Sequence, residues 1–416
     1  MPASRASSVP WRPSGKSAFS SRCWARTPGP IRPRRCEDGP FGPRHGGVAL
    51  TRSLEVLASP YLRGLIPYSP GKPIEEVERE LGIAESVKLA SNENPLGPSP
   101  MALQAMRNAL PDVHRYPDGS GHHLTRALAR HWDVSPEMVI LGNGSNELLE
   151  LAGRCFLMPG DEAVYAASAF IVYDMVAQVT GATKIVVPMR EFTHDLDAMR
   201  ASVSPRTKLL FVGNPNNPTG TAVPARALEA FLESMPRDVL VILDEAYYEF
   251  LSPDLIPDAL RFVRAGRPVL VLRTFSKIYG LAGLRIGYGI GPVPLIALLN
   301  RAREPFNTNS LAQVAATAAL CDEQHVASTR AVTEMGRKFL TEQCRSLGLS
   351  VIPSVANFVL VDVGRPGPAT ADALLRHGVI VRPMAGYGFA THLRISVGTP
   401  PEIERCVAAL KAVLGR

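Results

Sequence analysis

The chain has 416 residues, of which 46% are hydrophobic and 20% charged, so it is long enough for two domains and can bury a large core. No apolar run reaches the roughly 18 residues that a membrane-spanning helix needs, which argues against a membrane protein. The net charge of +7 arises in residues 1–48, where eight Arg and one Lys face two acidic residues, and the rest of the chain is balanced, with 36 basic and 36 acidic side chains. A balanced body lacks the basic excess expected of a nucleic-acid-binding protein.

Residues 1–48 are rich in Pro, Ser, Gly and Arg and show neither a helical nor a strand period, so we predict that they are disordered. Arg- and Ser-rich, acid-poor N-terminal segments can be organelle transit peptides, although these prolines and glycines would interrupt the amphipathic helix of such a peptide. A start codon assigned too far upstream would explain the segment equally well.

Ordered structure is expected from about Ser53. Residues 53–65 have the spacing of a helix, and residues 66–82 form an extended stretch that leads into a short helix. We interpret residues 49–97 as an N-terminal arm and the start of a small domain.

Residues 98–305 alternate between helical segments and short apolar runs. Near-continuous apolar runs of this kind are typical of the buried strands of a parallel, doubly wound sheet. We therefore predict an α/β fold whose large domain spans this range. The predicted strands are 162–168, 183–188, 207–215, 238–246 and 268–276.

Residues 306–416 predict a smaller α+β domain. A long helical stretch at 310–348 is followed by apolar runs that alternate with helices. These runs are 358–363, 378–384 and 392–398.

The six cysteines form neither a CxxC pair nor a zinc-like spacing. This distribution predicts scattered thiols in a reducing compartment, without a disulfide framework and without a metal site. We accordingly expect a cytoplasmic protein.

Polar residues follow three consecutive predicted strands, and in open parallel sheets ligands lie beyond the carboxyl ends of the strands. The first strand ends in Asn214–Gly220 (NPNNPTG), the second in Asp244–Tyr247 (DEAY) and the third in Thr274–Lys277 (TFSK). An amide, a carboxylate, a phenol and an amine would thus meet at one edge of the sheet. This set of groups suits pyridoxal 5'-phosphate (PLP).

Each of these groups has a task that PLP requires. The Lys277 amine can hold the cofactor's aldehyde, and the Asp244 carboxylate can keep the pyridine nitrogen protonated. Asn217 and Tyr247 can donate hydrogen bonds to the ring oxygen, which would also lower the pKa of the lysine–cofactor linkage. A solvated lysine, an ordinary turn or a helix cap would explain any one of these features, so the prediction rests on their joint order.

A glycine-rich turn supplies a candidate phosphate site. Gly142 and Gly144 permit a tight turn, and we expect Ser145 to cap the helix that follows, so that the phosphate rests on backbone N–H groups at the positive end of the helix. Arg285 could add a charged fork and Ser276 a hydroxyl group.

The same residues lie in blocks that resemble the signatures of class II aminotransferases, namely NPNNPTG (214–220), DEAYYEF (244–250) and RTFSKIYGLAGLRIGY (273–288). Further blocks make the chain similar to the histidinol-phosphate aminotransferase family from about residue 55 to residue 415. These blocks are YSPGKPIEEVERELG (68–82), KLASNENPLGPSP (88–100), RYPDGSG (115–121), GNGSNE (142–147), VRPMAGYG (381–388) and LRISVGTPPE (393–402).

The resemblance implies a fold type I PLP enzyme in which Lys277 carries the cofactor as a Schiff base. Phe170 resembles the aromatic residue stacked on the cofactor ring, and Tyr173 is less suited to that place. Tyr116 resembles a tyrosine that reaches the phosphate of the neighbouring subunit's cofactor, which implies a homodimer with shared active sites. The residues that resemble the phosphate cradle are Gly144, Ser145, Asn146, Ser276 and Arg285.

The family's reaction implies transfer of the amino group of L-histidinol phosphate to 2-oxoglutarate, giving imidazole acetol phosphate and glutamate in histidine biosynthesis, with ping-pong kinetics. Arg394 resembles the arginine that binds the substrate's anionic group. Arg382 resembles its second anion ligand, or else makes a structural ion pair. Tyr68 resembles a substrate-pocket residue from the N-terminal arm, whereas we take His122 and His123 as surface residues because a lysine fills the proton-transfer role.

Three alternatives remain open at this point. Aromatic amino-acid aminotransferases share nearly all of these motifs, and threonine-phosphate decarboxylases are further relatives, although no feature favours loss of carbon dioxide. A non-catalytic PLP-fold regulator would usually lack the lysine or carry a DNA-binding domain, whereas this chain keeps Lys277, Asp244 and Arg285. A dinucleotide-binding fold is disfavoured because GNGSNE is not the G-x-G-x-x-G turn of a βαβ unit.

Overall fold

The computed structural model describes residues 57–65, 67, 71–83 and 85–416. The chain divides into two units, Met1–Ala58 and Ser59–Arg416, and the second unit holds the fold described below. The expectations for residues 1–48 and for Tyr68 lie outside the described residues. In the described part of the helix expected at 53–65, Leu57 is helical and a 3₁₀ turn follows, η1 (Pro60–Leu62), which Ser59 caps.

The larger β-sheet has seven strands in the order β2-β8-β7-β6-β5-β3-β4. All neighbours from β7 to β4 are parallel, whereas β8 runs antiparallel to both β2 and β7. The predicted fold class, with a mainly parallel sheet, is confirmed. The strands are β2 (Val139–Gly142), β3 (Glu162–Ala166), β4 (Thr183–Val187), β5 (Thr207–Gly213), β6 (Leu240–Asp244), β7 (Val269–Thr274) and β8 (Gly287–Ile290).

The antiparallel edge formed by β2 and β8 was not predicted from the sequence. The sequence of β8 is GYGI, and glycine is generally unfavourable within a strand. One of these glycines is required by a close approach of backbones, because a Cβ atom on Gly287 would lie 2.4 Å from the backbone nitrogen of Ser145. Gly287 thus allows the first residue of helix α5 (Ser145–Phe156) to contact the sheet.

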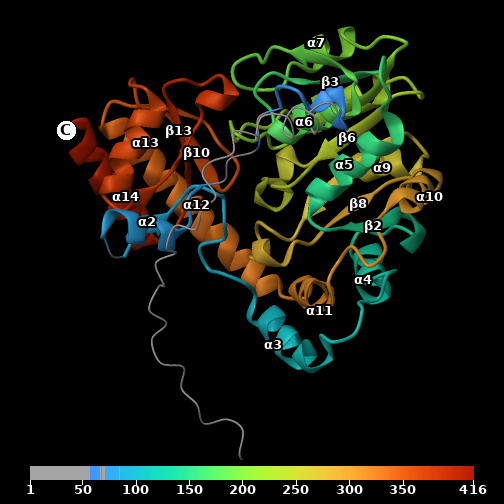
Figure 1. The fold of residues 1–416 in the computed structure, drawn as a ribbon, viewed down its shortest axis with the longest axis horizontal. Helices are drawn as coiled ribbons and strands as arrows, with labels where there is room; N and C mark the ends of the chain where they lie inside the picture. Colours follow the sequence, from blue (N-terminus) through green and yellow to red (C-terminus); the bar gives the residue numbers. More distant parts are fainter. Residues whose placement is uncertain (1–56, 66, 68–70, 84) are drawn as a thin grey trace, which may run out of the picture. The chain divides into compact units, whose positions relative to one another are not determined.

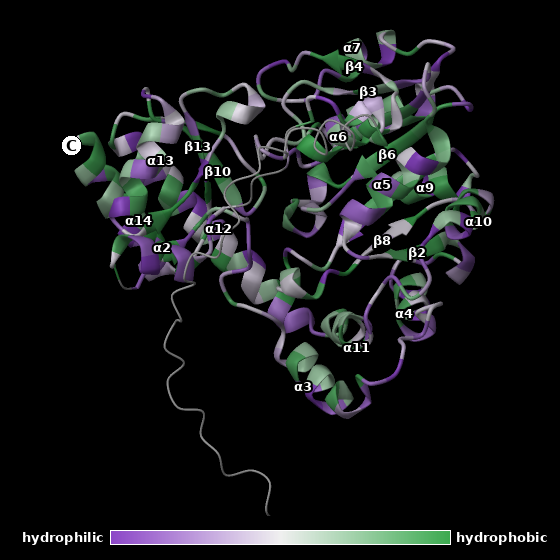
Figure 2. Ribbon diagram, viewed as in Figure 1, coloured by the Kyte–Doolittle hydropathy of each residue, from purple (hydrophilic) through white to green (hydrophobic). Residues whose placement is uncertain are grey.

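Helices cover both faces of this sheet. Successive side chains of a strand point to opposite faces, so a strand that is apolar throughout needs a covering layer on each side. In β6, Val241 and Leu243 enter one core, while Leu240 and Ile242 enter the other. Figure 1 shows the helices packed around the sheet, and its strands are mainly green in the hydropathy colouring of Figure 2. The core that contains Ile242 is covered by α5, α6 (Ile171–Thr180) and α10 (Val293–Ala302). The core that contains Leu243 is covered by α3 (Pro100–Ala109), α4 (His122–His131), α7 (Leu196–Ala201), α8 (Ala225–Ser234), α9 (Ala259–Arg264) and α11 (Ser310–Ala319).

A third core lies on a four-stranded antiparallel sheet of order β12-β13-β10-β9. The N-terminal arm joins it, since β1 (Val87–Lys88) pairs with β11 (Val379–Ile380). Val77 of α2 (Ile74–Leu81) packs nearby against Ile380. The remaining elements are β9 (Ser350–Ile352), β10 (Phe358–Asp362), β12 (Arg382–Pro383), β13 (His392–Ser396), α12 (Glu323–Ser346), α13 (Gly367–Arg376) and α14 (Pro400–Leu414).

The helical stretch predicted at 310–348 is two helices, α11 and α12, because the Asp322 side chain caps the start of α12 by accepting a hydrogen bond from the His325 backbone. The alanines of α11, among them Ala312, belong to the core of the larger sheet. Leu340 and Cys344 of α12 belong to the smaller domain. We therefore propose that the large domain extends to about residue 320, beyond the boundary at 305 that the sequence suggested. In the described part of the chain, no helix is both long enough and apolar enough to span a bilayer.

Candidate active site

The carboxyl ends of β5, β6 and β7 open onto a cavity of about 300 Å³. Asn217, Asp244 and Lys277, which follow or end these three strands, all line it. The predicted convergence of polar strand ends is therefore seen in the structure. Further predicted cofactor residues that line the same cavity are Ser145, Asn146, Phe170, Tyr247, Ser276 and Arg285.

Lys277 is half-buried in the lining of this cavity, and its Nζ donates a hydrogen bond of 3.3 Å to the carbonyl oxygen of Ser91. Burial lowers the pKa of Lys277 to about 8, and the positive charge of Arg394 acts in the same direction. A lysine with this pKa is neutral much more often at physiological pH than a solvated lysine. Its amine is therefore suited to nucleophilic attack and proton transfer.

Asp244 ends β6 as a buried carboxylate. The Tyr173 hydroxyl donates to its Oδ2 (2.8 Å), and the Ala246 backbone N–H donates to its Oδ1 (3.2 Å). Burial raises the pKa of Asp244, so a cationic partner in the cavity would be needed to favour its ionised form. Tyr173, Tyr247 and Phe170 all line the cavity. Because Tyr173 binds this carboxylate and stacks on Phe211, Phe170 remains the better candidate for stacking on a cofactor ring.

Tyr247 is held by a residue that the sequence analysis did not single out. The side-chain amide of Asn92 donates to the Tyr247 hydroxyl oxygen (2.8 Å), and burial raises the pKa of Tyr247 to about 12. The phenol therefore stays neutral at physiological pH and can donate its own proton to a ligand. Asn92 lies in the block KLASNENPLGPSP, which was noted for family resemblance only, and its contact with Tyr247 spans 155 positions of the chain.

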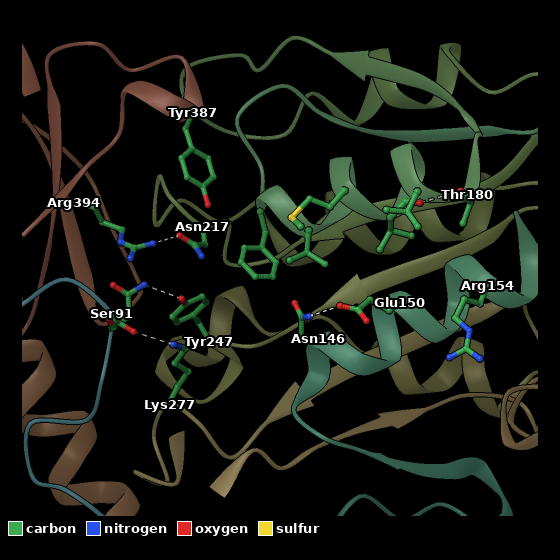
Figure 3. A pocket seen from close by; sticks show the side chains of 16 residues that line it. Ser91, Asn146, Glu150, Arg154, Thr180, Asn217, Tyr247, Lys277, Tyr387 and Arg394 are labelled. Atoms are coloured by element: carbon green, nitrogen blue, oxygen red, sulfur yellow. Dashed lines mark hydrogen bonds between the residues drawn. The ribbon is translucent and has the colours of Figure 1, made fainter. Parts of the chain in front are cut away.

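Asn217 is oriented by Arg394 (Figure 3). Arg394 donates one hydrogen bond to Asn217 Oδ1 (2.6 Å) and another to the carbonyl oxygen of Ala90 (2.7 Å). Since the amide oxygen of Asn217 is engaged, its amide nitrogen is directed elsewhere and can act as a donor. Arg394 thereby links the smaller domain to the strand end that carries Asn217.

The residues predicted to bind phosphate lie together at the start of α5, with one correction. Gly144, with φ +79° and ψ 161°, occupies the N-cap position, and Ser145 is the first helical residue rather than the cap. Arg285 lies against Gly144, since a Cβ atom there would be 2.5 Å from its guanidinium. Ser276 Oγ accepts hydrogen bonds from Arg285 (3.4 Å) and Thr274 (3.0 Å), so its own proton can be donated to an anion. Helix N–H groups, a guanidinium and a hydroxyl are the donors that a phosphate needs.

A second cavity, of about 630 Å³, shares Lys277 and Asn217 with the first and is also lined by Arg394 and Tyr387. Figure 3 shows Asn146, Glu150 and Arg154 along one side of it, on α5. The apolar residues of α6 that line this cavity are Val172, Met175, Val176 and Val179.

Other predicted site residues lie outside the linings of these two cavities. Tyr116 is 83% exposed and stacks on Phe306, with the ring centroids 4.9 Å apart. Arg382 lies directly opposite Arg394 on the neighbouring strand. His122 and His123 are exposed at the start of α4, as expected. Within the described ranges, no group of three or more His, Cys, Asp and Glu side chains is placed to hold a metal ion.

The residues present fit PLP. An amine, a buried carboxylate, two ring-oxygen donors and an anion cradle all face a cavity whose volume is in the range of small-molecule sites. The cradle depends on the missing side chain of Gly144, because a Cβ atom would displace the Arg285 guanidinium from it. On a mainly parallel sheet flanked by a smaller α+β domain, this arrangement defines the class of PLP-dependent aminotransferases.

Comparisons with known proteins refine this class. The family model for aminotransferase class I and II matches residues 84–410. A histidinol-phosphate aminotransferase of Moorella thermoacetica is 51% identical over 349 residues, which cover 84% of this chain and 90% of the relative. One from an Anaeromyxobacter species is 51% identical over 361 residues, which cover 86% of this chain and 99% of the relative.

Solved structures agree with these sequence matches. Histidinol-phosphate aminotransferase from Sinorhizobium meliloti, in complex with PLP, superposes with a TM-score of 0.79 at 30% identity, covering 86% of this chain and 97% of that one. Aspartate aminotransferase from Thermus thermophilus with maleate gives a TM-score of 0.75 at 25% identity, covering 86% and 99%. The chain belongs to the class I and II aminotransferases and, within them, to the histidinol-phosphate aminotransferase family.

Replacing Gly144 by alanine should weaken PLP binding about 10- to 100-fold, because the new methyl group would displace the Arg285 guanidinium, and a charged hydrogen bond contributes about 1.5–3 kcal/mol. The backbone conformation of Gly144 is also strained for any other residue, at a cost of about 1–3 kcal/mol. The dissociation constant of PLP and the urea midpoint measure the two effects. The control is Gly283→Ala in the 3₁₀ turn η6 (Ala282–Leu284) before Arg285, where a Cβ atom meets nothing within 4 Å. Equal PLP affinities for the two variants would contradict the cradle.

Proposed function

We propose that the protein transfers the amino group of L-histidinol phosphate to 2-oxoglutarate with PLP as cofactor, giving imidazole acetol phosphate and glutamate in histidine biosynthesis. The observation that carries this proposal is the 51% identity, over nearly the whole length of the relatives, to histidinol-phosphate aminotransferases. The cavity lined by Lys277, Asp244 and Arg394 supports it.

When bound, PLP supplies an aldehyde that captures amino groups and a protonated ring that withdraws electrons from the adjacent carbon. The Asp244 carboxylate would keep the proton on the ring nitrogen. Tyr247 and the amide nitrogen of Asn217 would donate hydrogen bonds to the ring oxygen. Lys277 Nζ removes the proton from the substrate carbon that bears the amino group, a task to which its lowered pKa suits it.

Arg394 is proposed to bind the anionic group of the substrate. Its guanidinium is buried, lines the larger cavity and is fixed by hydrogen bonds to Asn217 and to the carbonyl of Ala90. A planar guanidinium binds phosphate or carboxylate with two parallel hydrogen bonds. Arg382, which lies opposite Arg394 in the sheet, would add positive charge beside it.

The amino donor is tested by single-turnover mixing of the PLP-loaded protein with L-histidinol phosphate and, separately, with L-phenylalanine. Rapid loss of the bound cofactor's absorbance is expected with histidinol phosphate. Faster loss with phenylalanine would favour an aromatic amino-acid aminotransferase, the second candidate, which the apolar α6 residues of the larger cavity support. Absence of a response to either donor would overturn the proposed substrate.

We further propose a homodimer in which Tyr116 completes the partner's site, since this ring is largely exposed and lines neither cavity of its own chain. Mixing inactive Tyr116→Ala and Lys277→Ala subunits should then restore about a quarter of the wild-type activity, because half of the dimers would be mixed and each of these would hold one complete site. Activity after refolding the mixture measures this. No recovery, with mixed dimers present on a native gel, would contradict shared sites.

A cytoplasmic location is part of the same proposal. The described cysteines, Cys155, Cys321, Cys344 and Cys406, are all free thiols. Thiols that remain unpaired are expected in a reducing compartment.

A further inference from the structure

Arg273 is a fully buried arginine directly beneath the active site. It is 2% exposed, and its Nε and one terminal nitrogen bind the same oxygen of Glu245, at 2.8 Å and 2.7 Å. Its guanidinium also faces two aromatic rings, those of Trp132 and Tyr248, whose centroids are each 3.7 Å away and whose planes are nearly perpendicular. Each of these contacts is favourable for a desolvated guanidinium.

Two partners of Arg273 are next in sequence to Asp244 and Tyr247, the residues proposed to bind the cofactor ring. Glu245 follows Asp244, and Tyr248 follows Tyr247, so one guanidinium contacts the chain at both ends of this turn. Strand alternation places Asp244 on the face of Ile242 and directs Glu245 to the opposite face, where Arg273 lies on β7. The contact is therefore made behind the cavity and does not enter it.

Arg273 also belongs to the strand that leads to the lysine. Thr274 follows it, and the Thr274 hydroxyl accepts a hydrogen bond from the backbone N–H of Ser276, the residue before Lys277. The Trp132 ring that contacts Arg273 is held in place as well. Its Nε1 donates to the Tyr288 hydroxyl (2.9 Å), and Arg264 donates to the Trp132 carbonyl (3.1 Å). The Arg273 side chain thus connects the residues after β6, the end of β7 and the C-cap residue of α4.

We propose that Arg273 and Glu245 form a positioning pair, which holds Asp244 and Tyr247 at the distance from Lys277 that the cofactor requires. The proposal rests on the proposed function, because it concerns how PLP is held. Stability alone is a weak reason for such a pair, since well-packed apolar residues can replace a buried ion pair at little cost. A fixed distance between two strand ends, by contrast, needs directional contacts.

The test compares Glu245→Gln with Glu162→Gln. Glu162 is also a buried carboxylate paired with an arginine, Arg206 (2.6 Å), but it is the first residue of β3 and so lies at the amino end of the strands, away from the cavity. Glu245→Gln should weaken PLP binding to the apoenzyme about tenfold, and lower kcat about 10- to 100-fold with KM within about threefold. It should also shift the pH midpoint of the bound cofactor's absorbance, whereas Glu162→Gln should change only the urea midpoint.

Wild-type values of the PLP dissociation constant, the pH midpoint and kcat in folded Glu245→Gln would overturn the proposal. If that variant does not fold, Tyr248→Leu is used instead, because Tyr248 is half-buried and its loss leaves the ion pair intact. Tyr248→Leu should change PLP affinity, kcat and the pH midpoint in the same directions but by less. Unchanged PLP affinity and pH midpoint would overturn the pair's positioning role. All values are ratios to the wild-type protein, so a wild type that binds no PLP or transfers no amino group would instead refute the proposed function.

Discussion

Replacing Lys277 by alanine should lower kcat by on the order of 10⁴-fold or more, while the fold is retained. Lys277 is proposed both as the nucleophile that holds PLP and as the base that moves the substrate proton, and positioned proton transfer alone contributes about 10²- to 10⁴-fold. No other lysine lines either cavity among the described residues. Steady-state glutamate formation measures the loss, and circular dichroism checks the fold.

The control for this substitution is Lys338→Ala, which removes an exposed lysine from α12. It should leave kcat within about twofold, as surface substitutions usually have small effects. Lys277→Ala that keeps more than about 1% of wild-type turnover would contradict the assignment of both roles to this amine.

The pH dependence of PLP capture is a separate signature of the same lysine. Burial disfavours the ammonium form, so the pKa of Lys277 is lowered to about 8, and the neutral amine predominates above that pH. The rate at which the apoenzyme captures PLP should therefore rise with pH and level off above about 8. A rate that keeps rising toward pH 10.5, the ordinary value for lysine, would show that this amine is not desolvated.

The strand ends were predictable from the sequence because their signal is local. An apolar run followed at once by polar residues marks both a buried strand and its exit, and three such runs placed Asn217, Asp244 and Lys277 at one edge before any contact was known. The turn before α5 was predictable for the same reason. The assignment of the cap to Ser145 was wrong, because the positive φ of Gly144 moves the N-cap one residue earlier.

The supports behind these residues could not be predicted, because they join distant parts of the chain. Asn92 reaches Tyr247 across 155 positions, and Arg394 reaches Asn217 across 177. Family resemblance singled out Arg394 as an anion ligand, but no local pattern indicates that it contacts Asn217 or that Asn92 contacts Tyr247. The antiparallel strand β8 was missed for a different reason, since its two glycines, of which Gly287 lets α5 approach, weaken its apolar signal.

Asp244→Asn should lower kcat by on the order of 10²- to 10⁴-fold with little change in fold. The substitution keeps the shape of the side chain and an oxygen for the Tyr173 hydroxyl, but removes the negative charge that would hold the proton on the cofactor ring. Breaking a buried charge pair costs about 3–5 kcal/mol, and each 1.36 kcal/mol of barrier corresponds to about tenfold in rate. Pre-steady-state measurement of the donor half-reaction isolates this step from product release.

Two further variants separate charge from structure. Asp258→Asn is the matched control, because Asp258 is an exposed N-cap of α9, where asparagine caps about as well as aspartate. Asp244→Glu retains the charge but displaces it, so it should recover part of the rate that Asp244→Asn loses. If Asp244→Asn instead keeps kcat within about tenfold of wild type, the buried carboxylate is needed only to fix Tyr173 and the turn to Tyr247, and proton retention on the ring must come from another group.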